Sequence, residues 1–214
     1  APTDITSHSV ATSHFYDIFR YQILDTNSYI EEIWAYGYWA IDRCARIIKE
    51  GASFKEVTKG DLTEVEGCIA QAYAIKALCS FYLTNMFGLP YSEANKTTLG
   101  IVNVTEPVPA YSQVSRVSVE QNYSLILDDI TKAKEYYAKE GVENVGKQYM
   151  NTAAVAALEA RVKLYMKNYE GAITAAQEAI TLSGGTIVST KEDYKNMYTT
   201  LAVSTEDIFF IAKA

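Results

Sequence analysis

The chain has 214 residues, of which 49% are apolar and 21% charged, and 19 basic against 26 acidic residues give a net charge of −7. This balance excludes a typical nucleic-acid binder, which needs a concentrated basic face to displace the counterions of phosphates. An aromatic content of 12%, with seventeen tyrosines, argues against a disordered chain, and no apolar run approaches the roughly 20 residues of a membrane-spanning helix.

The first long helix is predicted from apolar residues that recur at helical spacing from Ile30 to Ile48. Asn27 or Ser28 is placed to cap its start, and Gly51 is expected to end it. A shorter stripe of the same spacing over residues 12–24 predicts another helix before it.

A second long helix is predicted to begin at a capping box, in which Asp61 precedes Glu64 by three residues. It is apolar on most sides and runs to Phe87, where Gly88 and Pro90 are expected to end it. A helix that is apolar nearly all round is expected at the centre of the fold, covered by its neighbours.

Residues 91–117 break the helical pattern with proline, glycine and short polar residues, so they predict a long connection of the kind that is often functional. Ser118 and Gln121 then form a second capping box at the start of a helix. Asn151 is placed to cap the next helix, and a last one closes at Gly184.

The predicted fold class is all-α, with tetratricopeptide-like helix pairs packed around the long apolar helix and a long irregular loop between helices. Small residues at Ala172, Ala176 and Ala179 would let a partner helix approach closely. A single domain is expected, with N-terminal helices over 27–90, the loop over 91–117, repeat-like helices over 118–183 and a tail over 184–214 that is β-like at 207–211.

Five segments lie in order along the chain at 34–43, at 75–91 with the ending Phe-Gly-Leu-Pro-Tyr, at 115–133, at 153–173 and at 204–209. Together these segments resemble the SusD/RagB family of glycan-acquisition lipoproteins. Lys76 stands where the family usually has arginine, so the planar guanidinium that can form two parallel hydrogen bonds is missing from this position. Family members are substantially longer, so the chain is expected to correspond to their helical N-terminal part, with a tail truncated relative to the family.

The resemblance implies a non-catalytic, surface-exposed lipoprotein of the outer membrane of Bacteroidetes-type bacteria. Such a protein captures oligo- or polysaccharide and delivers it to a SusC-like TonB-dependent β-barrel transporter. Its membrane contact is a lipid anchor on a cysteine that this chain does not contain, and neither a cofactor nor a nucleic acid is implied. The alternative is a tetratricopeptide-like scaffold for protein–protein interaction, with no sugar site in this portion.

Candidate sugar-binding residues follow from the chemistry of neutral sugars, which offer apolar faces to aromatic rings and hydroxyls to polar side chains. Trp34 and Tyr38 share one helix face and are expected to pack inside, whereas Tyr36 and Trp39 point elsewhere. On the long loop, two tyrosines and nearby amides (Tyr91, Tyr111, Asn95, Asn103 and Gln113) are candidates for a shallow polar-aromatic edge. The predicted ligand-binding set is Tyr36, Trp39, Tyr91, Asn95 and Tyr111, and ordinary packing or loop roles for the same residues remain open.

Neither a catalytic site nor a metal site is predicted. The three cysteines, Cys44, Cys68 and Cys79, lack zinc-site spacing and are expected to be small core residues, far in sequence from the only histidines, His8 and His14. Adjacent acids such as Asp128 and Asp129 diverge on a helix, whereas glycoside hydrolysis needs two carboxylates that face each other across roughly 5–10 Å.

Overall fold

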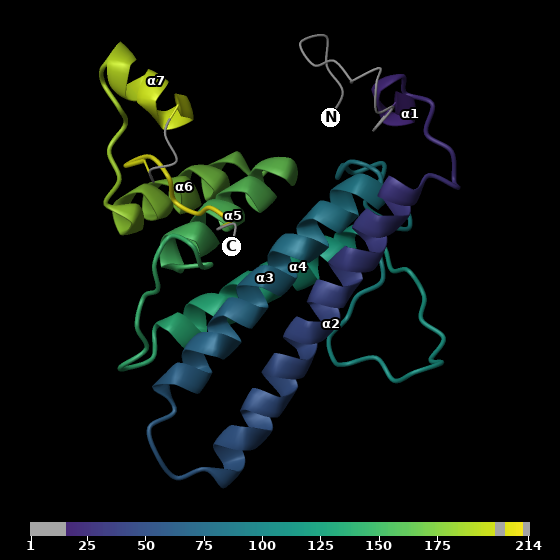
Figure 1. The fold of residues 1–214 in the computed structure, drawn as a ribbon. Helices are drawn as coiled ribbons and strands as arrows, with labels where there is room; N and C mark the ends of the chain where they lie inside the picture. Colours follow the sequence, from purple (N-terminus) through teal and green to yellow (C-terminus); the bar gives the residue numbers. More distant parts are fainter. Residues whose placement is uncertain (1–15, 200–203, 212–214) are drawn as a thin grey trace.

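The computed structural model describes residues 16–199 and 204–211, and the regular structure in these ranges is helical (Figure 1). The helices are α1 (Tyr16–Phe19), α2 (Ser28–Val57), α3 (Thr63–Phe87), α4 (Val119–Tyr137), α5 (Thr152–Tyr165), α6 (Tyr169–Ser183) and α7 (Lys191–Thr199). The described residues contain no β-strand, and a single antiparallel bridge pairs Leu99 with Ser118. The predicted all-α class is confirmed.

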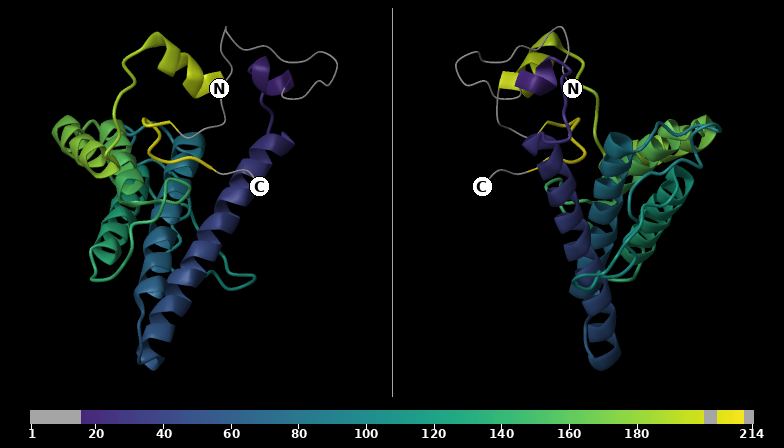
Figure 2. Two further views of the ribbon diagram at one scale, coloured as in Figure 1. Left: turned by 60° about the vertical axis from the view of Figure 1, so that its left-hand side comes forward. Right: turned by 90° about the vertical axis from the view of Figure 1, so that its right-hand side faces the viewer.

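Helix α3 occupies the centre of the fold. It packs against α2, α4 and α5, and α5 pairs in turn with α6. Figure 2 shows that the turn between α2 and α3 projects away from the rest, at the opposite end from α7. Ala70, Ala74 and Ala77 are fully buried on α3, and these small side chains let α4 approach closely. The central position predicted for the apolar helix is therefore confirmed.

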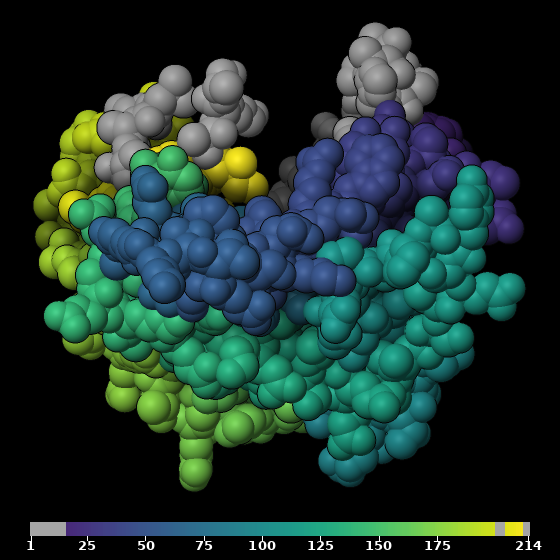
Figure 3. Space-filling model, turned by 90° about the horizontal axis from the view of Figure 1, so that it is seen from below, coloured from purple at the N-terminus to yellow at the C-terminus, as the bar shows by residue number. Residues whose placement is uncertain are grey.

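Two hydrophobic clusters hold the helices together. The larger one joins α3, α4 and α5 around Phe81, Tyr123 and Val155. The smaller one joins α2 and α3 to the loop over 91–117, and its buried members are Ile41, Ala45, Leu83, Ile101 and Val104. Burial of one such aliphatic side chain stabilises a fold by about 1.5–3 kcal/mol, so the smaller cluster fixes the base of the loop against α2. Figure 3 shows this teal segment lying against the purple-blue side of α2.

Several predicted helix ends are confirmed. The side chains of Asn27 and Asn151 accept hydrogen bonds from backbone N–H groups three residues on, at 3.3 and 2.8 Å. Gly184 ends α6 in the left-handed conformation, with φ of 58°. Ser118 and Gln121 form both bonds of a capping box at the start of α4.

Replacement of Ser118 by alanine is expected to lower the free energy of unfolding by about 1 kcal/mol, because the N–H of Gln121 loses its acceptor. Ser115→Ala, on the exposed loop nearby, is the matched control and should change it by less than about 0.5 kcal/mol. Urea unfolding of the two variants measures both values, and equal losses would contradict a capping role.

Two predicted helix boundaries are wrong. Helix α2 continues through Gly51 to Val57. The glycine serves to make room for α3, since a Cβ at this position would lie 2.9 Å from the side chain of Ile69. The capping box at Asp61 does not form, since α3 begins at Thr63 and Asp61 accepts the N–H of Thr63 from outside the helix, at 2.9 Å.

Three further expectations need correction. Cys44 is buried and Cys79 partly buried as expected, but Cys68 is exposed on α3. Residues 207–211 form no strand. The tail contains α7, which was not predicted although Thr190 and Asp193 bond reciprocally at its start, at 2.6 and 3.1 Å. Of the stripe over 12–24, only Tyr16–Phe19 is helical in the described part, whereas residues 12–15 and both histidines lie outside it.

Candidate functional site

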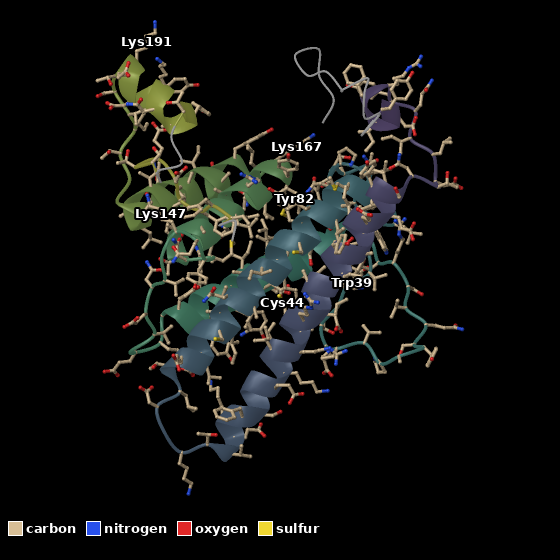
Figure 4. The ribbon with its side chains drawn as sticks, viewed as in Figure 1. Trp39, Cys44, Tyr82, Lys147, Lys167 and Lys191 are labelled. Atoms are coloured by element: carbon tan, nitrogen blue, oxygen red, sulfur yellow. The ribbon has the colours of Figure 1, made fainter. Side chains whose placement is uncertain are left out.

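A cavity of about 320 Å³ lies between α2 and the long loop. Its lining is aromatic and acidic on the α2 side and aliphatic on the loop side: Trp34, Tyr38, Trp39 and Asp42, then Val102, Val104, Val108 and Val114. Figure 4 labels Trp39 on α2, on the side of that helix next to the loop. A volume near the lower end of the roughly 300–1,000 Å³ typical of small-molecule sites suits a short part of a larger ligand.

The floor of the cavity comes from the aromatic residues predicted to pack inside. Trp34 meets the edge of Phe87 at a centroid distance of 4.9 Å and the ring of Tyr38 at 4.8 Å. Both Trp34 and Tyr38 pack against the smaller hydrophobic cluster, so their predicted structural role is confirmed. Burial raises the pKa of Tyr38, which keeps its hydroxyl neutral and available for hydrogen bonding.

The opposite wall is an extended backbone segment held by side chains of two helices. The Tyr38 hydroxyl donates to the carbonyl of Val102 at 3.1 Å and accepts its N–H at 2.8 Å. Asn122 of α4, only 1% exposed, accepts the N–H of Ile101 at 2.8 Å and donates to the Ile101 carbonyl at 3.1 Å and to Asn103 at 2.6 Å. The asparagine side chain thus pairs with the segment much as a neighbouring strand would.

Gly100 is required by this clamp. A Cβ at this position would lie 1.9 Å from Oδ1 of Asn122, closer than any real contact. The glycine N–H donates to Val117 at 2.8 Å, and the Val117 N–H donates to Ile101 at 3.0 Å, so the two ends of the loop also pair with each other. The loop therefore has a fixed base.

A buried ion pair lies beneath the wall. Lys76 of α3 and Asp129 of α4 are 2% and 3% exposed, and their Nζ and Oδ1 atoms are 3.0 Å apart. The Lys76 ammonium also donates to the carbonyl of Val104 at 3.2 Å. Desolvation raises the pKa of Asp129 to about 6, against the opposing effect of Lys76. Oδ2 of Asp129 has no hydrogen-bond partner in the described structure, whereas an arginine fork could pair with both oxygens.

The rim of the cavity is charged. Asp42 pairs with Arg46 at 2.7 Å, and the guanidinium of Arg116 lies 5.3 Å from the centre of the Trp34 ring. An apolar cavity with an indole at its mouth and charged groups around it is suited to the apolar face and the hydroxyls of a sugar.

Two of the five predicted site residues come together at this rim. Trp39 lines the cavity and is 56% exposed, and Tyr36 is 58% exposed and meets Trp39 edge to face at 5.1 Å and 88°. Tyr91 packs against Tyr123 at 5.0 Å, and the Asn95 side chain donates to the Pro90 carbonyl at 3.0 Å. Tyr111 is fully exposed in a left-handed conformation, with φ of 64°.

The polar-aromatic loop edge is thus divided between internal contacts and solvent. The Asn103 side chain also bonds inward, donating to Gln121 at 3.2 Å, while Gln113 is exposed. Asp42 was not predicted as a site residue, although its position three residues after Trp39 places both on one side of a helix. The four valines that line the loop side of the cavity were not predicted either, since no local pattern gives a signal for them.

Other kinds of site find little support in the described ranges. These contain no cluster of three or more His, Cys, Asp or Glu side chains that could hold a metal ion. None of the helices in the described part of the chain is both long and apolar enough to cross a bilayer. Asp128 is exposed and Asp129 is buried, so the two adjacent acids diverge.

Comparison with known proteins gives one family throughout. Residues 2–164 match the SusD-like family described as "Starch-binding associating with outer membrane". A SusD superfamily protein of Bacteroides thetaiotaomicron is 26% identical, with a TM-score of 0.81 over 97% of this chain and 44% of that one. A putative sugar binding protein of Bacteroides vulgatus is also 26% identical, with a TM-score of 0.76 over 92% and 44%.

A laminarin binding SusD-like protein shares the fold at 20% identity, with a TM-score of 0.59 over 78% of this chain and 34% of that one. No curated protein matches the chain. The chain spans less than half the length of each of these three solved relatives.

Proposed function

Because the chain belongs to the SusD-like family, we propose that it is a non-catalytic cell-surface protein that captures oligo- or polysaccharide and delivers it to a TonB-dependent outer-membrane transporter. The observation that carries the proposal is the exposed Tyr36–Trp39 pair at the mouth of the cavity. Exposed aromatic rings beside a carboxylate match the two kinds of contact that a sugar offers.

The geometry of this pair defines how a sugar would bind. Two rings at 88° cannot form one flat platform, so the pair makes a corner. A sugar ring stacked on one face would meet the other ring at its edge, with the Asp42 carboxylate within the same cavity to accept hydrogen bonds from the sugar hydroxyls. Tyr91, Asn95 and Tyr111 remain proposed contacts for more distant parts of a longer glycan.

The scaffold alternative also has a specific observation in its favour. Helix α6 exposes Tyr169, Ile173 and Ile180, which recur at helical spacing on its surface. In a solenoid, an apolar stripe of this kind is the surface against which the next helix pair packs. A purely interaction-based role would leave the Tyr36–Trp39 corner without a ligand.

The test is retention in native gels that contain soluble laminarin, starch or another polysaccharide in turn. Tyr36→Ala/Trp39→Ala is expected to abolish the retardation of the wild-type protein, since each lost aromatic anchor costs about 2 kcal/mol, or roughly thirtyfold in affinity. Tyr194→Ala/Tyr198→Ala, which removes a similar exposed pair with centroids 5.3 Å apart on α7, is the matched control and should bind normally.

Unchanged retardation of a folded Tyr36→Ala/Trp39→Ala protein would contradict the site. Single alanine variants at Tyr91, Asn95 and Tyr111 test the outer contacts separately. If the wild-type protein is retained by no polysaccharide, the scaffold function is favoured. Co-purification of the endogenous protein with a TonB-dependent transporter from outer membranes is the expected result for delivery, and its recovery from the cytosol would contradict it.

A further inference from the structure

We propose that Lys76 is a positioning residue for the sugar pocket, which holds the wall over residues 101–104 in place through the Val104 carbonyl while Asp129 holds Lys76. The role of this wall in sugar binding rests on the proposed function. The contact between the ion pair and the wall does not, because it is a feature of the fold itself.

The ion pair contacts one residue of the pocket lining, Val104. The ammonium of Lys76 lies 3.0 Å from Oδ1 of Asp129 and donates to the Val104 carbonyl at 3.2 Å. Val104 is a buried member of the smaller hydrophobic cluster, and it lines the cavity into which Trp39 also faces. A displacement of the ammonium would therefore remove one of the bonds that fix the cavity wall.

Lys76 supplies the positive charge that balances the buried Asp129 carboxylate. The ionisable groups that face Asp129 are Lys76 and Tyr73 from α3 and Cys44 from α2, with Asp128 beside it on α4. Of these groups, only Lys76 is positively charged, and the second carboxylate oxygen has no partner in the described structure.

Protonation of Asp129 would leave the buried Lys76 ammonium with the Val104 carbonyl and the face of Tyr73, whose centre is 5.7 Å away. An uncompensated buried cation is unfavourable, and movement toward water relieves the cost at the expense of the Val104 bond. Burial raises the pKa of Asp129 to about 6, so the wall should loosen in mildly acidic solution.

Global stability should respond in the opposite direction. A carboxyl whose pKa is higher in the folded state than in the unfolded state stabilises the fold fully below its unfolded pKa of about 3.9, and this contribution is lost as the pH rises through about 6. Acidification through pH 6 should therefore loosen the wall without a loss of global stability from this group. A purely structural role for the ion pair would move both quantities together.

The experiment measures amide hydrogen exchange by mass spectrometry from pH 7.5 to pH 5, corrected for intrinsic rates. In the wild-type protein, protection over residues 101–104 is expected to fall about tenfold near pH 6, while residues 155–162 in the core of α5 stay protected. Lys76→Arg should move this step to lower pH, because the guanidinium pairs with both carboxylate oxygens. Lys76→Met/Asp129→Leu, an apolar pair that should fold, is expected to show low protection of the wall at every pH.

Protection over 101–104 that is independent of pH in the wild type, or that is unchanged in the double variant, would overturn the positioning role. Polysaccharide retardation measured over the same pH range separates the two proposals. A fall in the protection of residues 101–104 near pH 6, without retention of any polysaccharide, would refute the proposed function and support the positioning role. Retention of a polysaccharide with no pH-dependent change in the protection of the wall would support the proposed function and refute the positioning role.

Discussion

Replacement of Lys76 by methionine is expected to lower the free energy of unfolding by about 3–5 kcal/mol at pH 8, because it leaves the Asp129 carboxylate buried without its counter-charge. The loss should be smaller at pH 5. Lys76 opposes the rise of the Asp129 pKa, so in its absence the carboxyl takes up a proton at higher pH and becomes neutral.

Urea unfolding at pH 8 and pH 5 measures this difference. Lys132→Met is the matched control, because Lys132 is exposed on α4 and its pair with Glu135 at 2.7 Å is a surface contact that water screens and that contributes little to stability. Losses at Lys76 that are equal at the two pH values, or no greater than at Lys132, would show that the pair is not the source of the stability.

Helix ends set by local chemistry were predictable from sequence. Asn27, Ser118 and Asn151 each accept a backbone N–H three residues away, so donor and acceptor fall within one window of sequence. The left-handed Gly184 is equally local. Such contacts depend little on what packs around the helix.

Features set by another part of the chain were not predictable in this way. Glycine often ends a helix, but Gly51 lies within α2, where the absence of a side chain lets Ile69 of α3 pack closely. Cys68 was expected in the core because of its residue type, yet its side chain is exposed on α3. Residue type and periodicity give the helix, but not which of its sides another helix reaches.

The same distinction between local and long-range contacts applies to the candidate site. Helical spacing separated Tyr36 and Trp39 from Trp34 and Tyr38, and the structure places the first two outside and the last two against the core. The cavity wall follows from a contact between Asn122 and a segment 21 residues earlier, which no short pattern reveals. An aromatic corner was thus predictable as a set of exposed rings, but the pocket beside it was not.

The Asn122 clamp leads to a second large effect. Asn122→Ala is expected to lower the free energy of unfolding by about 2–3 kcal/mol, because the buried N–H of Ile101 loses its acceptor and the Asn103 side chain loses its donor, while the Ile101 carbonyl keeps only the N–H of Val117. Asn144→Ala, which removes a single exposed bond of 3.1 Å to the N–H of Thr152, is the control and should cost about 1 kcal/mol or less. Thermal or urea unfolding gives both values, and equal losses would contradict the clamp.

A double-mutant cycle with Gly100 distinguishes a specific clamp from general sensitivity of this region. In the wild-type background, Gly100→Ala should destabilise by about 1–3 kcal/mol, since its Cβ would lie 1.9 Å from Oδ1 of Asn122 and force that side chain away. In the Asn122→Ala background the space is already vacant, so the same change should cost much less. Strong coupling between the two sites is therefore expected, and additive effects would mean that Gly100 is needed for some reason other than the approach of Asn122.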